Sequence, residues 1–394
     1  MKKIAIIVER ADITLGGAER SVLELASALS AGDFDVHVIA ANGQADAKNI
    51  HILCPRPNAN RSCLYTFEKE LKEHLAENHY DIIHSVLPFD FADVYQPRGG
   101  TYAESILRST ASYQNNFLQI YKRLTAFANR RRTPLLKAEK KLCLNSNGPI
   151  VAALSQYVAE QFKRHYNLSD NRLVVIPNGV KVNKQAVDIS EAEKLRKQIL
   201  IEANISNADN PIFLLFAANN FRLKGLAVLI KALNLVQRQN KAKNVRLIVV
   251  GKDNTCKYRH LSKKLSVLEK IVFLGSVRNI QNVLSIRDVA VLPTFYDPSS
   301  RFTLESLAAD KPVITTKYNG ATDLFVDSRH GKVIDSPDNI LALAEAIVYF
   351  SNSENIKNAL KAIIEDNLKE QISIKRVVEQ LSSLYESILK RKQK

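Results

Sequence analysis

Cysteine is scarce in this sequence, and so are the patterns that bind metals. The chain has four cysteines and eight histidines among 394 residues, and no two cysteines form a C-x-x-C pair. The histidines form no ligand-spaced cluster with the cysteines. We therefore expect neither a zinc site nor a disulfide framework, and we expect reduced thiols that are mostly buried. The cysteines are Cys54, Cys63, Cys143 and Cys256.

Long hydrophobic runs are also absent. The longest apolar stretches, such as "IAIIV" near the start and "IFLLFAA" at 212–218, have five to seven residues, whereas a helix that spans a bilayer needs about 20. The opening "MKKIAIIVERAD" is similar to a signal peptide, but its apolar core is too short, and Glu9 and Arg10 end it. We expect a buried first strand there and a protein that stays in the cytoplasm.

Positive charge is in excess. The chain has 56 Lys and Arg against 40 Asp and Glu, which gives a formal net charge of +16. A basic surface suits phosphates, anionic membranes or nucleic acid, and composition alone leaves all three open. The length and the hydrophobic content of 46% allow two domains with large cores.

Short apolar runs alternate with helical patterns along the whole chain. The first series includes "KIAIIV", "DVHVIA" and "YDIIHSV", and the second includes "IFLLFAA", "VRLIVVG", "IVFLGS", "VAVLPT" and "PVITT". Short, wholly apolar strands spaced by helices are typical of parallel sheets covered on both faces. We predict two doubly wound α/β domains, with the boundary near 180–210, where "IPNGVKVNKQAVDISEAEK" turns polar.

The segments that follow the strands carry the candidate site, because open parallel sheets bind ligands beyond the carboxyl ends of their strands. After the first strand, Gly16 and Gly17 precede a helical stripe. A double glycine lets backbone approach a ligand closely, beside a helix N-terminus that favours anions. The same glycines also fit a plain tight turn, and no G-x-G-x-x-G fingerprint is present.

Two cations follow the first strand of the second series. In "NNFRLKG", Arg222 and Lys224 stand just before a helix that starts near Gly225. Cations beside free helix amides suit a diphosphate, and each charge-assisted hydrogen bond contributes roughly 1.5–3 kcal/mol. A solvated loop explains one such cation but explains the strand-cation-helix arrangement less well. Gly251 follows the next strand of this series.

The stretch "FYDPSSRFTLESLAADKPVITT" at 295–316 places two acids around a predicted helix start. Asp297 and Glu305 lie eight positions apart, after the strand "VAVLPT". Ser299 or Ser300 is a candidate N-cap. Glu305 would then lie in the second turn of the helix.

Together these motifs resemble those of the retaining nucleotide-sugar glycosyltransferases of family four, which have the two-domain GT-B fold. "DPSSRFTLE" resembles the family's E-x7-E motif, with Asp297 at the first acidic position. "LGGAERSVLELA" is similar to its amino-terminal glycine loop, "FRLKG" to its diphosphate-binding segment and "IPNGV" to its inter-domain linker. The resemblance covers nearly the whole chain and is strongest over 212–325. Within the family, it is closest to the lipopolysaccharide-core glycosyltransferases that act at the inner-membrane face.

The resemblance implies a role for each motif. Lys224 and Arg222 would hold the donor diphosphate and serve in catalysis with Asp297, which would face the transferred sugar. Glu305 would bind the ribose hydroxyls, because a carboxylate accepts hydrogen bonds. The other donor-binding residues implied are Gly16 and Gly17 in the closing loop, Asn219, Gly251, the backbone of Val277 and Arg278 around the base, and the amides of Ser300 and Arg301 at the helix start.

The sequence departs from the family pattern at three of these positions. Asn219 stands where many members have arginine, and Arg222 is the candidate substitute. Asp297 replaces a glutamate, and Ser300 stands where glycine is usual. These departures leave the identity of the sugar open.

The resemblance also implies the domain roles. Residues 1–180 would bind the acceptor, 181–210 would form the linker, and 211–373 would bind the nucleotide-sugar. The C-terminal helix expected at about 374–394 is free to pack back on the first domain.

Two candidate acceptor sites lie in the first domain. We expect Arg98, Gly99 and Gly100 of "PRGG" to contact the acceptor. His84, after "YDIIH", is a second candidate, and the alternative for it is a hydrogen-bonded core histidine.

We expect no metal and no cofactor, because transferases that use a metal typically carry Asp-x-Asp. The only such triplet, Asp33-Phe34-Asp35, fits a solvated strand start. Lys224, Arg222 and helix N-termini would neutralise the leaving diphosphate instead. No carboxylate pair can be assigned as nucleophile and acid. We therefore expect a same-face, oxocarbenium-like route in which a phosphate oxygen helps to deprotonate the acceptor.

Residues 104–141 combine basic and aromatic side chains. They hold nine Lys or Arg and only two acids, Glu104 and Glu139, with Phe117 and Phe127 among them. This composition is typical of an interfacial amphipathic helix, in which each basic residue near an anionic membrane contributes about 1 kcal/mol. A solvated helix face over a core stripe is the alternative. Nucleic acid is disfavoured, because no recognised fold or stacking motif supports it.

We expect a peripheral membrane glycosyltransferase that transfers a hexose, from a UDP-sugar above all, to a cell-envelope glycolipid at the cytoplasmic membrane face. Another GT-B enzyme, such as a nucleotide-sugar epimerase or a phosphorylase, is an alternative. Epimerases lack the basic aromatic middle, and phosphorylases need a cofactor lysine that is not evident here. A catalytically inactive membrane-binding scaffold is the third possibility, and Asp297 in place of glutamate keeps it open.

Overall fold

The computed structural model describes most of the chain. The described residues are 1–12, 16–44, 48–55, 63–113, 115–125, 129, 132–182, 188–202, 211–277 and 279–393. Arg278, expected near the nucleotide base, lies outside them, as do Phe127, Arg130 and Arg131 of the basic middle.

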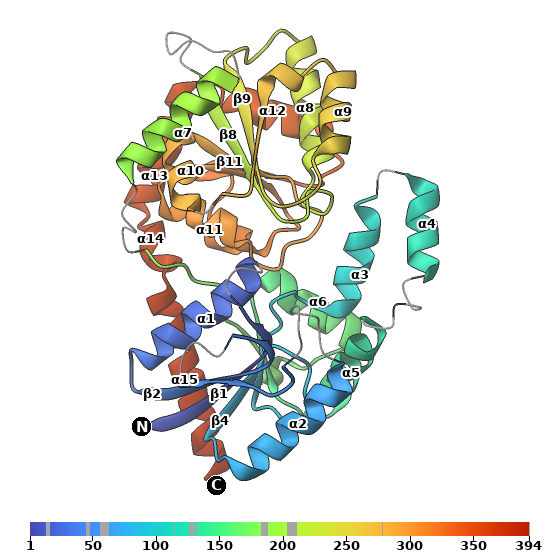
Figure 1. The fold of residues 1–394 in the computed structure, drawn as a ribbon, viewed down its shortest axis with the longest axis vertical. Helices are drawn as coiled ribbons and strands as arrows, with labels where there is room; N and C mark the ends of the chain where they lie inside the picture. Colours follow the sequence, from blue (N-terminus) through green and yellow to red (C-terminus); the bar gives the residue numbers. More distant parts are fainter. Residues whose placement is uncertain are drawn as a thin grey trace. The chain divides into compact units, whose positions relative to one another are not determined.

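The chain divides into two compact units (Figure 1). The first comprises Met1–Thr110, Gln114–Gly179 and Ser373–Lys394, and the second comprises Ala111–Tyr113 and Val180–Ile372. The C-terminal segment therefore belongs to the first unit, although it follows the whole of the second in sequence.

A seven-stranded sheet forms the centre of the first unit, in the order β3-β2-β1-β4-β5-β6-β7. Every neighbouring pair in it is parallel. The strands are β1 (Lys2–Ala11), β2 (Phe34–Gly43), β3 (Ile50–Ile52), β4 (Ile82–Ser85), β5 (Val94–Tyr95), β6 (Ile150–Ala153) and β7 (Leu173–Val175). The α-helices are α1 (Gly17–Ser30), α2 (Leu64–Glu77), α3 (Tyr102–Ala111), α4 (Asn116–Leu124), α5 (Arg132–Leu144), α6 (Gln156–Tyr166) and α15 (Ile374–Lys392).

A six-stranded parallel sheet forms the centre of the second unit, in the order β10-β9-β8-β11-β12-β13. Its strands are β8 (Ile212–Ala217), β9 (Val245–Val250), β10 (Ile271–Gly275), β11 (Val289–Leu292), β12 (Val313–Thr316) and β13 (Gly331–Ile334). Its α-helices are α7 (Ile189–Glu202), α8 (Leu226–Arg238), α9 (Cys256–Lys264), α10 (Ile280–Ile286), α11 (Arg301–Ala308), α12 (Ile340–Tyr349), α13 (Ser353–Glu365) and α14 (Leu368–Gln371).

Strand β1 shows why an all-apolar run becomes a central strand. Ile4 and Ile6 pack in the cluster that includes α1 and α15, whereas Ala5 and Ile7 pack on the other face with α2. Successive side chains of a strand point to opposite faces, so a strand with helices on both sides needs apolar residues at every position. The same division holds along β8 in the second unit. The prediction of two doubly wound parallel-sheet domains is confirmed.

The basic middle of the sequence forms three helices, α3, α4 and α5, rather than one. Helix α4 buries none of its residues, whereas α5 buries Leu135, Glu139, Leu142 and Cys143. The side chain of Asn115 starts α4 afresh, because its Oδ1 accepts from the backbone N–H groups of the two residues after Asn116. Helix α4 therefore has the exposed surface expected of an interfacial helix. Helix α5 fits the alternative, a solvated helix face over a stripe of core residues.

The four cysteines are thiols outside any disulfide, as expected. The expectation that they are mostly buried is wrong, because only Cys143 is buried and both Cys63 and Cys256 are exposed. Cys256 begins helix α9 on its outer side, where a small side chain meets no packing demand.

Three histidines that the sequence did not connect meet in the first unit. The Nδ1 of His37 on β2 lies 2.9 Å from the Nε2 of His51 on β3, and the rings of His51 and His74 on α2 have centroids 5.2 Å apart. The Nε2 of His74 lies 3.0 Å from the hydroxyl of Tyr80. Burial, followed by the charges of His74, His37 and Lys3, lowers the pKa of His51. Burial also lowers the pKa of His74, although Glu77 opposes it.

We expect the double variant His51→Gln/His74→Gln to lose less stability on acidification than the wild type. Both histidines have a lower pKa in the folded chain than the ordinary value of about 6.5, so the unfolded chain binds more protons as the pH falls through that value. The folded chain therefore loses stability as the pH falls. Urea unfolding at about pH 7.5 and about pH 5.5 measures the loss. His79→Gln, at a side chain 87% exposed, is the control. An equal loss in the double variant and the wild type would contradict the prediction.

Candidate active site

The candidate donor residues of the second unit lie in the segments that follow its strands, at one edge of the sheet. Strands β8, β9, β10 and β11 run parallel, so the segments after them emerge at the same side. Arg222 and Lys224 follow β8, Gly251 follows β9, Val277 follows β10 and Asp297 follows β11. Parallel pairing alone therefore brings together residues that lie far apart in the sequence.

Lys224 and Asp297 form an ion pair at this edge. The Nζ of Lys224 lies 2.7 Å from the Oδ2 of Asp297 and donates to the carbonyl of Tyr296 at 2.9 Å. The two side chains are only 20% and 15% exposed. The backbone of Asp297 is held on both sides, since its N–H donates to Tyr318 O at 2.9 Å and its carbonyl accepts from Gly320 at 2.8 Å. These backbone hydrogen bonds therefore fix the position from which the carboxylate pairs with the ammonium group.

Two glycines let the backbone pass close to the sheet at this edge. Gly225 has φ +83°, and a Cβ there would lie 2.0 Å from the carbonyl oxygen of Pro293. Gly251 has φ +147°, and a Cβ there would lie 1.7 Å from the carbonyl oxygen of Ala218. Both positions therefore exclude a side chain for reasons of packing as well as backbone conformation. Asn219, beside Ala218, is exposed.

The first turn of α11 is fixed by Asn319, a residue that the sequence analysis did not select. Asn319 is fully buried, and its Nδ2 donates to the hydroxyls of Thr303 and Thr315, each at 3.0 Å. Its Oδ1 accepts from the N–H of Ser300 at 3.2 Å and from that of Ala321 at 3.1 Å. One buried amide thus ties the helix start to β12 and to the turn after it.

Ser300 is the N-cap of α11, one of the two positions expected for it. Its Oγ accepts from the N–H of Thr303 at 3.3 Å. Its own N–H, however, already donates to Asn319. The structure therefore does not support the expected use of the Ser300 amide as a donor to a diphosphate.

Glu305 lies in the second turn of α11, as expected, and pairs with Arg301. The Nε of Arg301 is 2.7 Å from the Oε1 of Glu305, and both side chains are largely buried, at 13% and 10% exposed. The spacing of four residues brings the two groups onto one face of the helix. Arg301 and Glu305, both expected to contact the donor, are thus brought together.

Arg287, which the sequence analysis did not select, is a buried cation near this helix. Only 1% of it is exposed, and its Nη1 donates to the carbonyl of Leu284 at 2.6 Å. Among the residues that the structure describes, its Nε and Nη2 have no hydrogen-bond partner. Burial lowers the pKa of Arg287 to about 9, against the opposing charges of Glu305 and Asp288. An Arg-Asp pair directly before the apolar run "VAVL" was the available signal.

Arg222 contacts two residues of the second unit, Ser112 and Tyr113. Its Nη1 hydrogen-bonds to the hydroxyl of Ser112, and its guanidinium lies 3.9 Å from the centre of the Tyr113 ring. A guanidinium over an aromatic face is attracted by the ring quadrupole. Arg222 thus contacts Ser112 and Tyr113, whereas Lys224 contacts Tyr296 and Asp297, and the expected part of Arg222 in a shared diphosphate site stays a prediction.

The glycine loop of the first unit is described from Gly16 onward. Gly16 is the N-cap of α1, Gly17 is its first residue, and Gly16 O accepts from the N–H of Arg20 at 3.1 Å. Glu19 of this first turn forms an ion pair with Arg10 at the end of β1. These contacts fix the helix start, and the closing role of the two glycines stays a prediction.

A cavity of about 400 Å³ opens beside this loop, within the first unit. Arg98 and Gly99 of the "PRGG" segment line it, together with residues of β1, α1, α3 and α5. Arg98 donates from Nη1 to the Oδ1 of Asn178 at 2.7 Å. Gly100 follows with φ +65° and is buried, so it forms the turn and does not line the cavity.

His84 does not belong to this cavity. Its side chain is 1% exposed, and its Nδ1 lies 2.5 Å from the hydroxyl of Tyr385 on α15. Burial, followed by the charge of Arg98, lowers the pKa of His84 to about 3. The structure therefore favours the alternative given for His84, a hydrogen-bonded core histidine, over a contact with the acceptor.

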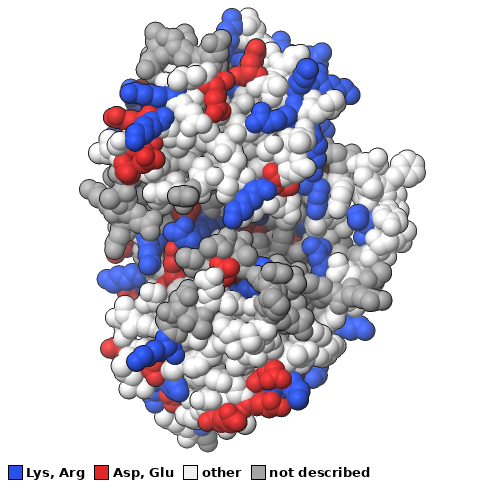
Figure 2. Space-filling view, viewed as in Figure 1, with Lys and Arg blue, Asp and Glu red and all other residues white. Residues whose placement is uncertain are grey.

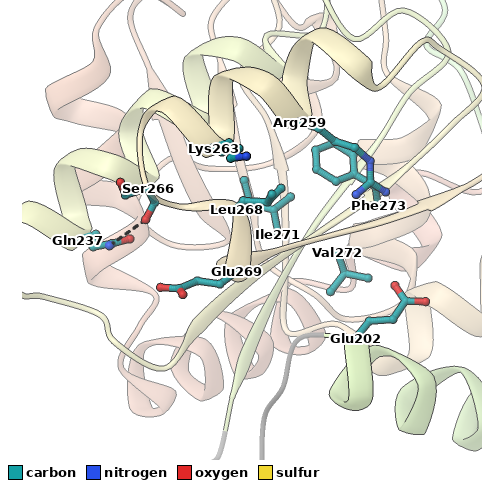
Figure 3. Close-up of a pocket in the computed structure, with 10 residues that line it drawn as sticks. All are labelled: Glu202, Gln237, Arg259, Lys263, Ser266, Leu268, Glu269, Ile271, Val272 and Phe273. Atoms are coloured by element: carbon teal, nitrogen blue, oxygen red, sulfur yellow. Dashed lines mark hydrogen bonds between the residues drawn. The ribbon is translucent and has the colours of Figure 1, made fainter.

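A second cavity, of about 690 Å³, lies against β10 in the second unit (Figure 3). The guanidinium of Arg259 lies 4.6 Å from the centre of the Phe273 ring at its border. Gln237 donates from Nε2 to the carbonyl of Ser266 at 3.0 Å. None of the described residues expected in the donor site lines this cavity.

Two family models match the chain. Residues 15–184 match the model "Glycosyltransferase Family 4", and residues 197–369 match "Glycosyl transferases group 1". Among curated proteins, the lipopolysaccharide glucosyltransferase WaaG of Escherichia coli is 23% identical over 329 residues, 82% of each chain. The capsular polysaccharide biosynthesis glycosyltransferase CapM of Staphylococcus aureus is 23% identical over 247 residues, 61% of this chain and 62% of CapM.

Solved structures share the fold of this chain. The crystal structure of WaaG superposes with a TM-score of 0.75 at 19% identity, over 97% of this chain and 99% of that one. Anabaena HepE in complex with UDP-glucose superposes with a TM-score of 0.70 at 18% identity, over 98% of this chain and 100% of that one. Both match along the full length, so the likeness covers both units.

We expect Asn319→Ala to lower the free energy of unfolding by about 3 kcal/mol, because it leaves several buried donors and acceptors without partners. Thermal or urea unfolding measures the loss. Asn358→Ala, at an exposed position of α13, is the matched control and should be close to neutral. If both variants unfold at the wild-type midpoint, Asn319 does not hold the start of α11.

Proposed function

Because the chain belongs to the GT-B glycosyltransferases, with a family 4 domain followed by a group 1 domain, we propose that it transfers a hexose from a nucleotide-sugar to a cell-envelope glycolipid. The family assignment confirms the resemblance found in the sequence and the general reaction. A UDP-sugar donor and a lipopolysaccharide-core acceptor are the finer parts of the proposal. They are supported by the similarity to WaaG, named as a lipopolysaccharide glucosyltransferase, and to HepE, solved with UDP-glucose.

The ion pair of Lys224 and Asp297 is the observation that carries the proposal. A cation and an acid meet there at the carboxyl edge of a parallel sheet, beside the first turn of α11. Such an edge is where open α/β sheets bind their ligands. Lys224 would contact the donor diphosphate, and Asp297 would face the transferred sugar. Glu305, held on α11 by Arg301, would accept hydrogen bonds from the ribose hydroxyls.

Departure of the diphosphate demands positive charge at the leaving group. We assign this task to Lys224, with Arg222 as a second cation, and propose that transfer needs no metal. The Asp33-x-Asp35 triplet supports this reading by its position, since it lies at the amino end of β2, which starts at Phe34. That end of a parallel strand is opposite to the ligand-binding edge. Preorganised cations stabilise developing negative charge without reorganising during the reaction.

We propose that transfer proceeds with retention. The acceptor would enter on the same face of the sugar as the departing phosphate, one of whose oxygens helps to remove the acceptor proton. Asp297 is the only carboxylate assigned to the sugar, so no glycosidase-like pair of acids is invoked. Arg98 and Gly99, which line the cavity of the first unit, are the candidate acceptor contacts there.

We expect Lys224→Ala to weaken the binding of UDP-glucose by about tenfold to a hundredfold, since a charge-assisted hydrogen bond contributes roughly 1.5–3 kcal/mol. Isothermal titration measures the affinity, and hydrolysis of the donor without acceptor reports turnover. Lys357→Ala, at a side chain 74% exposed on α13, is the control. Wild-type affinity and hydrolysis in Lys224→Ala would refute the donor site proposed here. No hydrolysis in either protein would favour a scaffold over an enzyme.

Helix α4 is the proposed membrane contact. Phe117, Ile120, Tyr121 and Leu124 recur at the spacing of one helical face, and they are 85%, 59%, 59% and 74% exposed. Lys122 and Arg123 lie in its last turn. An uncovered apolar stripe beside basic residues suits the surface of an anionic bilayer.

The surroundings of α4 agree with this proposal. In Figure 2 the surface at α4, at the right of the view, is mostly uncharged, with Lys and Arg atoms beside it. Among the residues that the structure describes, no helix is both long enough and apolar enough to cross a bilayer. We propose peripheral attachment at the cytoplasmic face, through α4 and the basic residues of 104–141, and no role in nucleic-acid binding.

We expect Phe117→Ser/Leu124→Ser to reduce binding to vesicles that contain anionic lipid by about a hundredfold or more, because burial of each large apolar side chain contributes roughly 1.5–3 kcal/mol. Vesicle sedimentation at low salt measures the binding. Leu341→Ser/Ile364→Ser removes two exposed apolar side chains from the second unit and is the matched control. Binding to neutral vesicles as strong as to anionic ones would contradict the electrostatic part of the proposal.

A further inference from the structure

The cavity against β10 lies at the amino end of that strand. It is lined by Ile271, Val272 and Phe273, the first three residues of β10, and by Glu202, the last residue of α7. The candidate donor residues follow the carboxyl ends of their strands, so the cavity lies toward the opposite side of the sheet. Its volume of about 690 Å³ falls in the range of small-molecule sites. A ligand in this cavity would therefore leave the proposed donor site unoccupied.

Two cations from α9 border the cavity. Arg259 and Lys263 are four residues apart, so they lie on one face of that helix, and both are exposed. The guanidinium of Arg259 lies 4.6 Å from the centre of the Phe273 ring. Contact with an aromatic face leaves the N–H groups of a guanidinium, which lie in its plane, to hydrogen bonds. In the part of the chain that the structure describes, neither cation forms an ion pair.

Two acids border the same cavity apart from these cations. In Figure 3, Glu269 lies at the left of the view and Glu202 at the lower right, whereas Arg259 and Lys263 come from the helix above. The Oε1 of Glu202 accepts from Gln198 at 2.9 Å, and no described residue donates to Glu269. Cations and carboxylates thus face one cavity as separate groups. A ligand that carries both an anionic group and hydroxyls satisfies both, because carboxylates accept hydrogen bonds from hydroxyls.

Apolar side chains form the floor between the charged groups. Ile271, Val272 and Phe273 are buried, and Leu268 is half-buried beside them. Small-molecule sites commonly combine such an apolar lining with a few polar groups that fix the orientation of the ligand. The C–H groups of a sugar ring match this floor, with its substituents directed to the charged rim.

We infer that this cavity binds a phosphorylated sugar or polyol, at a site separate from the proposed donor site. The phosphate would contact Arg259 and Lys263, because its several oxygens can accept charge-assisted hydrogen bonds from both cations. Hydroxyls of the same ligand would donate to Glu202 and Glu269, and its ring would lie on the apolar floor. The inference goes beyond the proposed function, which makes no use of this cavity.

Isothermal titration with glucose 6-phosphate, glucose and inorganic phosphate tests this, each in saturating UDP so that the proposed donor site is occupied. We expect wild type to bind glucose 6-phosphate about tenfold or more tightly than either other probe. Arg259→Gln/Lys263→Gln should weaken the binding of glucose 6-phosphate by about tenfold to a hundredfold and leave that of glucose unchanged. Glu202→Ala/Glu269→Ala should reduce the preference for glucose 6-phosphate over inorganic phosphate, since only the sugar offers hydroxyls to these carboxylates.

The matched control is Lys357→Gln/Lys361→Gln, which removes two cations four residues apart on α13, at side chains 74% and 76% exposed. It should bind all three probes as wild type does. Thermal unfolding at the wild-type midpoint shows that each variant is folded. The inference is overturned if wild type binds the three probes equally or not at all. It is also overturned if the arginine-lysine variant keeps the wild-type affinity for glucose 6-phosphate, or if the glutamate variant keeps the wild-type preference.

Discussion

Parallel pairing of the strands is the constraint on which the candidate site depends. Two parallel neighbours cannot be joined by a tight turn, so each connection must cross back over a face of the sheet, usually as a helix. The crossovers bury both faces, which is why β1 and β8 carry apolar residues at every central position. They also deliver every loop after a strand to the same edge. Lys224 and Asp297 are 73 positions apart in the chain, yet they meet there at 2.7 Å.

Two of the cations at this edge, Lys224 and Arg301, form ion pairs within the protein. Lys224 is held by Asp297, and Arg301 is held by Glu305. These pairs are mostly removed from solvent, so leaving one member alone would cost more than it would at the surface. A diphosphate that binds Lys224 must therefore contact its ammonium group at least as favourably as Asp297 does. The short side chain of Asp297 suits this arrangement, because its backbone is fixed by Tyr318 and Gly320 and a longer acid would have to fold back to reach the same ammonium group.

Local sequence patterns predicted much of the fold and of the candidate site, and non-local contacts account for the features that those patterns missed. The strands, the N-cap of α11 and the second-turn position of Glu305 follow from periodicity and spacing, which act over a few residues. Asn319 orders the start of α11 from 19 positions away, and Tyr385 hydrogen-bonds to the Nδ1 of His84 from 301 positions away. No local pattern marks such partners, because their contacts join residues far apart in the sequence. The histidine cluster arises likewise, from strand register between β2 and β3 and a helix laid beside them.

The two acids of the basic middle explain how that segment can present positive charge outward. Glu104 is 1% exposed and is bonded by Arg108, Arg164 and His165. Glu139 is fully buried, where it accepts from the hydroxyls of Tyr95 and Tyr166 and from a backbone N–H at the start of α3. Burial raises the pKa of Glu139 to about 7 despite these hydrogen bonds, so burying its charged form costs free energy. The same hydrogen bonds link α5 to α3 and α6. Both acids thus anchor α3 and α5 from inside. The charges that the described part of 104–141 exposes to solvent are consequently basic, and they lie on and beside α4, a helix that buries none of its residues.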